Sequence, residues 1–162
     1  MWKKIKPYIL PFTVAIAIPL AVGALSAFLT KDNMDIYSKI NTPPLSPPAI
    51  LFPIVWSILY ALMGVSSGMV YINRESNPQD AKNGFYYYGL SLVANFLWSI
   101  LFFNLGAFLF SLVCLIALLY FIIQTIYFYK NVNKVAAYLQ IPYAIWVAFA
   151  GYLNTAIFLL NM

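Results

Sequence analysis

Five long apolar stretches divide this chain and limit what it can fold into. They cover about residues 7–29, 48–72, 84–103, 106–129 and 135–160. Each reaches the ~20 residues that an α-helix needs to cross the hydrocarbon core of a bilayer. Membrane-spanning strands would instead show ~10-residue segments of alternating polarity, and these stretches are apolar on every face. We therefore expect an all-α membrane protein, a bundle of five transmembrane helices, with residues 1–162 forming a single domain.

The composition agrees with a location in lipid, and the basic residues suggest an orientation. The chain is 64% hydrophobic and only 8% charged, whereas soluble domains are about half apolar and one quarter charged. Basic residues gather on one side of the predicted bundle: Lys3, Lys4, Lys6, Arg74, Lys82, Lys130 and Lys134, against Lys31 and Lys39 on the other. The positive-inside rule then predicts an inside N-terminus and an outside C-terminus. Because these residues are scattered through short loops, the net charge of +5 indicates topology and no nucleic-acid partner.

Several kinds of chemistry are disfavoured by what the sequence lacks. It has no histidine, and its four carboxylates (Asp32, Asp35, Glu75 and Asp80) all fall between the apolar stretches. Ion-coupled transporters normally keep charged groups at bilayer depth, and hydrolases need a positioned acid–base pair. One thiol, Cys114, without imidazole cannot form a tetrahedral metal site. We expect neither ion-coupled transport, nor classical acid–base catalysis, nor a bound metal.

Aromatic and amide side chains are what remains inside the predicted spans. Trp56, Trp98 and Trp146 lie deep in three of them, away from the interfaces where tryptophan is usually found. An indole offers a wide face for stacking and one N–H donor. Asn95 and Asn154 are costly in lipid unless they are hydrogen-bonded. The tryptophans and asparagines together have two interpretations. Either the asparagines join helices by hydrogen bonds and the tryptophans fill the core, or both line a pocket for a flat apolar ligand.

Helical spacing favours the pocket. Trp56 and Tyr60 are four residues apart on one helix face. In the last span a second face carries residues spaced three, four and four apart: Tyr143, Trp146, Ala150 and Asn154. We expect these faces to meet around an uncharged cavity. The predicted ligand-binding residues are Trp56, Tyr60, Asn95, Trp98, Tyr143, Trp146, Ala150 and Asn154.

The connector at residues 30–46 is the longest polar segment, and it ends in two proline pairs. It is either an ordered lid, with Pro43, Pro44 and Leu45 as candidate lid residues, or a stiff spacer. Ser46 is a plausible N-cap for the second span, with Pro47 at the first helical position. The very short turn at Asn104-Leu105-Gly106 predicts that the third and fourth spans are antiparallel neighbours.

Small residues in the second span predict a close helix contact. Gly64-x-x-x-Gly68 lets another backbone approach, either within the chain or in a dimer. Gly23 and Ala27 form a similar pair in the first span, where packing within the chain is the favoured interpretation.

Three motifs between about residues 37 and 158 point to a known family. They are Pro43-x-x-x-Pro47-Pro48 followed by Val55-Trp56-x-x-Leu59-Tyr60-x-x-Met63-Gly64; Asn95-x-x-Trp98 with Phe102-Phe103; and Pro142-Tyr143-x-x-Trp146-x-Ala148-Phe149-Ala150-x-x-Leu153-Asn154. This pattern resembles the TspO or translocator proteins, also called tryptophan-rich sensory proteins and peripheral-type benzodiazepine receptors.

The resemblance implies a function. It implies five helices, often as a homodimer, around a cavity that the first loop closes and that binds porphyrins such as protoporphyrin IX or haem. Some members bind sterols, so a sterol or lipid partner is a further expectation. The porphyrin or haem would be a ligand, with no cofactor required, and binding would serve sensing, sequestration or transport. Two alternatives stay open: light-dependent porphyrin degradation, with Trp56 and Trp146 as implied catalytic residues, and a structural or assembly role.

The chain departs from the family pattern in three places. Thr42-Pro43-Pro44-Leu45 stands where the family usually has Lys-Pro-Ser-Trp, and Ser91 replaces a common glutamine. The C-terminus, Asn161-Met162, lacks the Tyr and Arg of the animal sterol motif, although Val65-x5-Tyr71-x2-Arg74 fits that loose pattern elsewhere.

Overall fold

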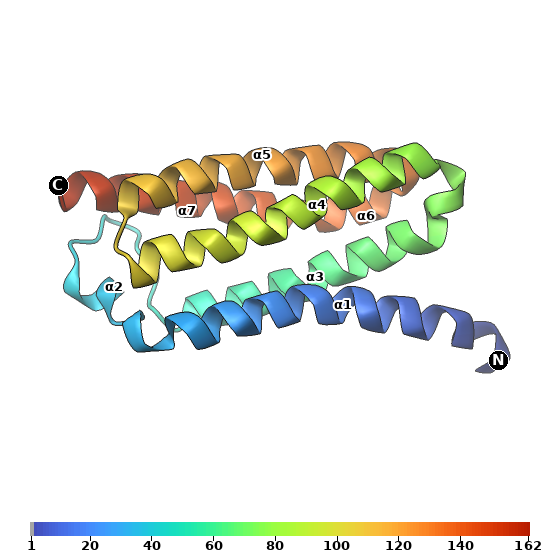
Figure 1. Ribbon diagram of the computed structural model, residues 1–162, viewed down its shortest axis with the longest axis horizontal. Helices are drawn as coiled ribbons and strands as arrows, with labels where there is room; N and C mark the ends of the chain where they lie inside the picture. Colours follow the sequence, from blue (N-terminus) through green and yellow to red (C-terminus); the bar gives the residue numbers. More distant parts are fainter. Residues whose placement is uncertain (1) are drawn as a thin grey trace.

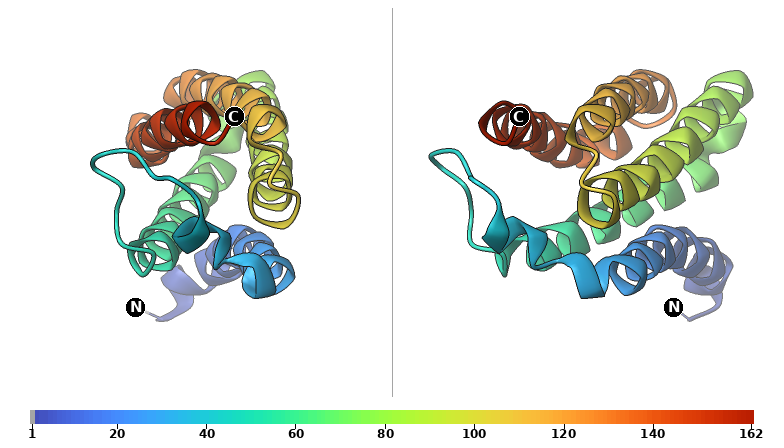
Figure 2. Two further views of the ribbon diagram at one scale, coloured as in Figure 1. Left: turned by 90° about the vertical axis from the view of Figure 1, so that its left-hand side faces the viewer. Right: turned by 60° about the vertical axis from the view of Figure 1, so that its left-hand side comes forward.

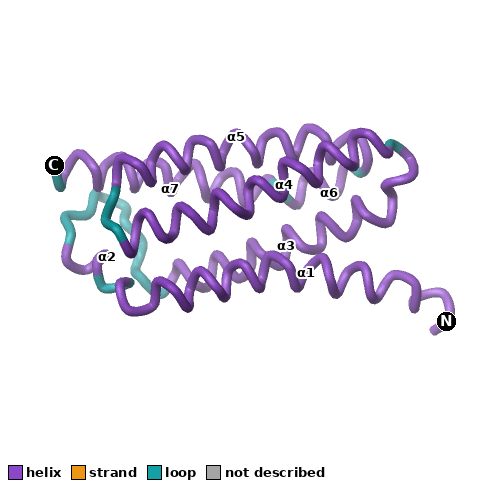
Figure 3. The backbone as a smooth tube through the Cα atoms, viewed as in Figure 1, coloured by secondary structure: helices purple, strands orange, loops and turns teal. Residues whose placement is uncertain are grey.

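The computed structural model describes residues 2–162, with side chains described from Tyr8 onward. Seven α-helices are found there: α1 (Trp2–Thr30), α2 (Ile36–Lys39), α3 (Leu51–Asn73), α4 (Pro78–Ser99), α5 (Phe108–Val132), α6 (Lys134–Leu139) and α7 (Ile141–Leu160). Short 3-10 turns follow α1 and α3 at Lys31–Asn33 and Arg74–Ser76, and a π-helical turn, Ile100–Asn104, extends α4. Residues 2–162 contain no β-strand. The long helices lie alongside one another as a bundle (Figures 1 and 3).

Five helical segments are long and apolar enough to cross a membrane, which confirms the predicted fold class. They are Tyr8–Asn33, Leu51–Ser76, Pro78–Asn104, Phe108–Val132 and Lys134–Leu160. Large apolar side chains cover their outer faces, as at Phe110 and Ile145, which are 68% and 65% exposed. Lipid is the solvent in which such surfaces are stable. The side chains of Lys3, Lys4 and Lys6 lie outside the described residues, and the orientation of the termini stays a prediction.

Asparagine and proline set two of the helix boundaries. The side chain of Asn77 accepts a hydrogen bond from the backbone N–H of Asp80 at 3.3 Å, with Pro78 at the first position of α4. Pro142 lies in the first turn of α7, where its missing N–H separates this helix from α6. Together α6 and α7 form the fifth span.

The predicted start of the second span is wrong. We expected Ser46 to cap a helix beginning at Pro47, but α3 begins at Leu51. The backbone N–H and the hydroxyl of Ser46 both donate to the carbonyl of Pro43, at 3.3 and 2.6 Å. These bonds close a turn whose third residue, Leu45, has a φ of +68°. Ser46 cannot cap the helix because the turn already uses its hydroxyl.

The paired glycines bring α1 against α3. A Cβ added at Gly64 would lie 2.4 Å from the Cα of Ile16, so the two backbones are in contact there. Gly68 also faces α1, and Gly23 packs on the ring of Tyr60, 2.2 Å from where its Cβ would be. Of the two interpretations of the glycine motif, close packing within the chain is therefore the one observed.

Helices α4 and α5 are antiparallel neighbours, as the short turn predicted (Figure 1). Gly106, in that turn, has a φ of +57°, a left-handed conformation that suits glycine. Helix α5 also packs against α7. The α1–α3 pair thus lies beside a group made of α4, α5 and α7.

The connector between α1 and α3 crosses one end of the bundle (Figure 2). The hydroxyl of Tyr152 on α7 donates to the carbonyl of Pro44 at 2.9 Å. Asn41 and Asn161 exchange two hydrogen bonds of 3.0 Å between backbone and side-chain groups. The connector is therefore held to the C-terminal end of α7.

Candidate functional site

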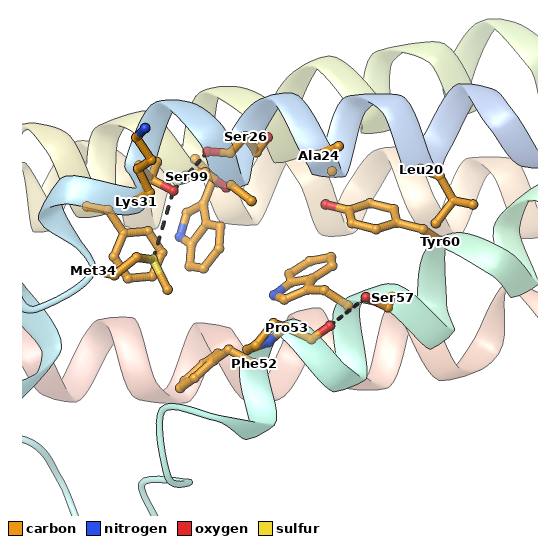
Figure 4. A pocket seen from close by; sticks show the side chains of 16 residues that line it. Leu20, Ala24, Ser26, Lys31, Met34, Phe52, Pro53, Ser57, Tyr60 and Ser99 are labelled. Carbon is orange, nitrogen blue, oxygen red and sulfur yellow. Dashed lines mark hydrogen bonds between the residues drawn. The ribbon is translucent and has the colours of Figure 1, made fainter.

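A cavity of about 580 Å³ lies between α1, α3 and the C-terminal end of α4 (Figure 4). This volume falls in the ~300–1,000 Å³ range of small-molecule sites. Its rim carries exposed residues of both neighbouring helices, Leu20 and Ala24 on α1 and Pro53 and Ser57 on α3. The cavity therefore opens between α1 and α3 toward the outer, lipid-facing surface of the bundle.

Three of the predicted ligand-binding residues form one aromatic wall of this cavity. The ring of Trp56 stacks on Tyr60 with centroids 5.5 Å apart, and it lies 6.2 Å from the ring of Trp98. Phe103 meets Trp98 edge-on at 6.0 Å. All four residues line the cavity. The wall gives a flat guest a broad apolar surface on which to stack.

The two buried asparagines hold this wall in position. Asn95 donates from Nδ2 to the hydroxyl of Tyr60 at 3.0 Å, and Asn154 accepts from Nε1 of Trp98 at 3.1 Å. Ser111 donates to the same oxygen of Asn154 at 2.9 Å. Both asparagines are only 1% exposed, and neither lines the cavity. Their amides satisfy aromatic partners that would otherwise be unpaired in lipid.

The four predicted residues of α7 lie behind the wall. Tyr143 meets Trp56 edge-on at 6.1 Å, and Trp146 meets Phe52 edge-on at 6.0 Å. Ala150 and Asn154 line a separate hollow of about 20 Å³. We expected one cavity between the second, third and fifth spans, but the structure places the cavity on the α1 side of that aromatic cluster.

Helix α1 supplies a wall that the sequence analysis missed. Its lining residues Leu20, Ala24 and Ala27 are spaced four and three apart, so they share one helix face, and Lys31 follows in the 3-10 turn after α1. The two alanines leave open the space that larger side chains would fill. These residues carry no distinctive chemistry, and their spacing was the one available signal.

We had expected an uncharged cavity, but one charged residue lines it. Lys31 lies at one end, its ammonium nitrogen 4.6 Å from the ring centroid of Phe28. Of the described residues that line the cavity, Lys31 alone is charged. Ser26 also lines it, and its buried hydroxyl has no hydrogen-bond partner within the described part of the chain. The cavity thus combines an aromatic wall, a free hydroxyl and one cation.

The candidate lid residues do not line the cavity. Pro43 is buried, Pro44 accepts the bond from Tyr152, and Leu45 is 82% exposed. Lys31 and Met34, at the start of the connector, do line it. Among residues 2–162 no group of three His, Cys, Asp or Glu side chains could hold a metal ion.

Comparison with known proteins identifies the family. Residues 15–160 match the TspO/MBR family. The chain belongs to this family. The matched region includes every residue that lines the cavity. Family membership and the five apolar helices together make the chain a multi-pass integral membrane protein.

Relatives in the family are similar over nearly their whole length. The chain is 36% identical over 154 residues to the tryptophan-rich protein TspO of Chlorobaculum tepidum, which covers 94% of this chain and 97% of that protein. It is 38% identical over 154 residues to the TspO of Archaeoglobus fulgidus, with 94% and 98% covered. The translocator protein of Bos taurus is 30% identical over 138 residues, with 85% and 82% covered.

Proposed function

We propose that this TspO/MBR family protein binds a flat tetrapyrrole, a porphyrin or haem, in the cavity between α1, α3 and α4. The observation that carries the proposal is the aromatic wall of Trp56, Tyr60 and Trp98 beside a hollow of about 580 Å³. A planar macrocycle gains stacking and apolar contact from such a wall.

The polar groups of the cavity suit the edge of a tetrapyrrole. Porphyrins such as protoporphyrin IX carry carboxylates on one edge, and Lys31 supplies a cation at one end of the cavity. The free hydroxyl of Ser26 can donate to the same edge. A charge-assisted bond to Lys31 would orient the macrocycle, while the rings supply most of the apolar contact.

The small hollow behind the wall gives the residues of α7 a role. It shares Phe52, Trp98 and Phe103 with the cavity, so movement of these side chains would join the two spaces. Ala150 and Asn154 would then reach the ligand. Trp146 would contribute through its contact with Phe52.

The opening toward lipid favours a ligand that arrives through the membrane phase. Sensing, sequestration and transport are all compatible with that route. The connector at residues 31–50 would cover the end of the bundle during binding, because it is tied to α7 through Pro44 and Asn41.

Titration with protoporphyrin IX tests the proposal. The protein in neutral detergent should shift the porphyrin's main absorption band in a saturable way, a readout that does not depend on the number of tryptophans. Trp98→Phe and Ala24→Phe, which alter the wall and fill the cavity, should weaken binding. The control is Tyr138→Phe, a change at an exposed side chain outside the cavity. Equal affinity for all four proteins would refute the site.

Light-dependent porphyrin degradation is a second candidate. The observation that favours it is the close series of oxidisable rings Trp98, Trp56 and Tyr60 at the cavity wall. Illumination of the complex should then give a discrete product whose yield falls in Trp56→Phe. Identical bleaching in the variant and in free porphyrin would remove this candidate.

The observation that motivated a structural or assembly role now has another explanation. The glycine face of α3 that suggested an intermolecular contact packs on α1 of the same chain.

A further inference from the structure

A second hollow, of about 540 Å³, lies between α1, α3 and α4 toward the N-terminal half of α1. Its walls are almost entirely apolar, and it shares no lining residue with the cavity described above. We call it the trough. It is lined by Leu10, Pro11, Val14, Ala15, Ile18, Ser67, Tyr71, Phe85, Tyr88, Gly89 and Leu92.

The trough continues into a polar hollow at one end of the bundle. This hollow, of about 460 Å³, shares Tyr71 and Phe85 with the trough, and its other lining residues include Arg74 and Lys82. An apolar channel therefore leads to two cations. The distribution of basic residues predicts that this end faces the inside of the cell, where basic residues meet lipid headgroups.

Both cations are available to an anion. The guanidinium of Arg74 lies 4.1 Å from the ring centroid of Tyr71 and donates to the carbonyl of that residue at 2.6 Å. Lys82 is exposed. The one ion pair among the described residues is Lys39–Asp35, so neither cation is paired with a carboxylate there. Glu75 also lines the polar hollow, which leaves a local charge of +1.

Tyr88 lines the trough deeper in the bundle, and its hydroxyl is buried. Tyr88 is only 7% exposed, and its oxygen has no hydrogen-bond partner within residues 8–162. Ser67 and Tyr71 also carry hydroxyls and line the trough, and the hydroxyl of Ser67 is bonded to that of Tyr129 at 3.1 Å. Tyr88 lies six residues beyond Lys82, which is about 9 Å along a helix. The ring of Tyr88 therefore adds an aromatic surface to the trough at a depth that the acyl chain of a glycerolipid would reach.

The trough also has free space along α4. A Cβ added at Gly89 would meet nothing within 4 Å. An unbranched acyl chain can fill such a space without displacing the helices.

We propose that the trough binds an anionic phospholipid, with one acyl chain between α1 and α4 against the ring of Tyr88 and the phosphodiester at Arg74 and Lys82. This site is separate from the tetrapyrrole cavity. The proposal commits to a phospholipid because the apolar and cationic parts are continuous, which matches the two ends of one amphiphile. A second protein copy would have to bring an anion to the cations and an apolar group to the trough.

Competitive lipid retention tests the proposal. The full chain in neutral detergent is equilibrated with equimolar phosphatidylglycerol and phosphatidylcholine of identical acyl chains, and bound lipid is counted by native mass spectrometry. The wild type should retain phosphatidylglycerol about tenfold more strongly, because the choline cation of phosphatidylcholine offsets the attraction of its phosphodiester to Arg74 and Lys82. Arg74→Gln with Lys82→Gln should abolish that preference. Equal retention of the two lipids by the wild type would overturn the proposal.

A double variant serves as the control that separates Arg74 and Lys82 from general electrostatic attraction. Lys130→Gln with Lys134→Gln removes the same charge from residues predicted to lie on the same side but outside the polar hollow, so the preference should survive. Its loss in this control would overturn the assignment to Arg74 and Lys82.

Gly89→Leu tests the acyl part, because the new side chain would occupy the trough. It should lose most of the bound phosphatidylglycerol while binding protoporphyrin IX as the wild type does, so the two sites can fail separately. Full lipid retention by Gly89→Leu would overturn the proposal. Displacement of the lipid by glycerol phosphate alone would also overturn it, because the site would then recognise only a headgroup. Displacement by a neutral sterol would overturn it too, because the site would then be a sterol site.

Discussion

Nε1 of Trp98 donates a hydrogen bond to Oδ1 of Asn154 at 3.1 Å, which joins α4 to α7 behind the cavity wall. The same amide donates from Nδ2 to the carbonyl of Phe108 at 2.8 Å, so it also reaches the start of α5. Three spans therefore meet at one side chain. An indole that lines the cavity on one face is fixed in its orientation by this bond.

We expect Asn154→Ala to destabilise the protein by about 1–3 kcal/mol, because Trp98 and Ser111 lose their shared acceptor in a dry environment. The measurement is thermal unfolding in detergent. Thr155→Ala is the matched control, since this exposed hydroxyl bonds only to its own helix at Gly151. A similar loss of stability in Asn154→Ala and Thr155→Ala would mean that the hydrogen bonds of the Asn154 amide do not stabilise the fold.

A methyl group at Gly64 should disrupt the packing of α1 on α3. Gly64→Ala places a Cβ 2.4 Å from the Cα of Ile16, and backbone cannot move aside as a flexible side chain can. Overpacking of this kind costs about 1–3 kcal/mol. Gly89→Ala, where the Cβ meets nothing within 4 Å, should keep or slightly raise the melting temperature, because alanine favours the helix over glycine. The reverse order of stabilities would contradict the observed contact.

Lys31→Gln should weaken binding of a dicarboxylate porphyrin about two- to fivefold, as expected for one partly solvated ion pair. Binding of the corresponding neutral diester should not change. The measurement is the absorbance titration at two salt concentrations. Salt should screen the ion pair and so reduce the difference in affinity between the wild type and Lys31→Gln. Lys39→Gln is the control, since Lys39 pairs with Asp35 and does not line the cavity. An equal effect of Lys31→Gln on acid and ester would exclude the proposed contact.

Tyr152→Phe should loosen the connector with little effect on global stability. The change removes the hydroxyl that bonds to the carbonyl of Pro44, while the exchange between Asn41 and Asn161 stays. Hydrogen exchange at the backbone amides of Thr42, Leu45 and Ser46 should become faster, and ligand release should become faster if this segment covers the bound ligand. Tyr138→Phe, at another exposed tyrosine, is the control. Unchanged exchange would show that the bond does not restrain the connector.

The sequence predicted the spans better than the site. Span lengths follow from local hydrophobicity, and the five predicted stretches agree with the five helical spans. The start of α3 was predicted wrongly because the hydroxyl of Ser46 could form either of two local hydrogen bonds. It bonds to the carbonyl of Pro43 in the turn and does not cap the helix. Such competition between a cap and a turn depends on backbone geometry that residue type alone does not specify.

Candidate site residues could be found by their chemistry, but not placed. Trp56, Tyr60 and Trp98 do line the cavity, because aromatic residues deep in the spans were easy to recognise. Spacing put Trp146 on a helix face without saying which neighbour that face meets, and it meets Phe52. Ala24 was not singled out, and Ala27 was interpreted only as a helix-packing residue, because what both contribute to the cavity is a small side chain.

The backbone contact at Gly64 lies on α3 between Tyr60, in the cavity, and Ser67, in the trough. The two helices also touch at Gly68 and Gly23, but there the contact is with the side chains of Phe12 and Tyr60, which can move more easily than the backbone at Gly64. A tilt of α1 about Ile16 that widened one hollow would narrow the other. Occupants of the two hollows would then oppose each other, and by linkage each would lower the affinity for its counterpart by the same factor.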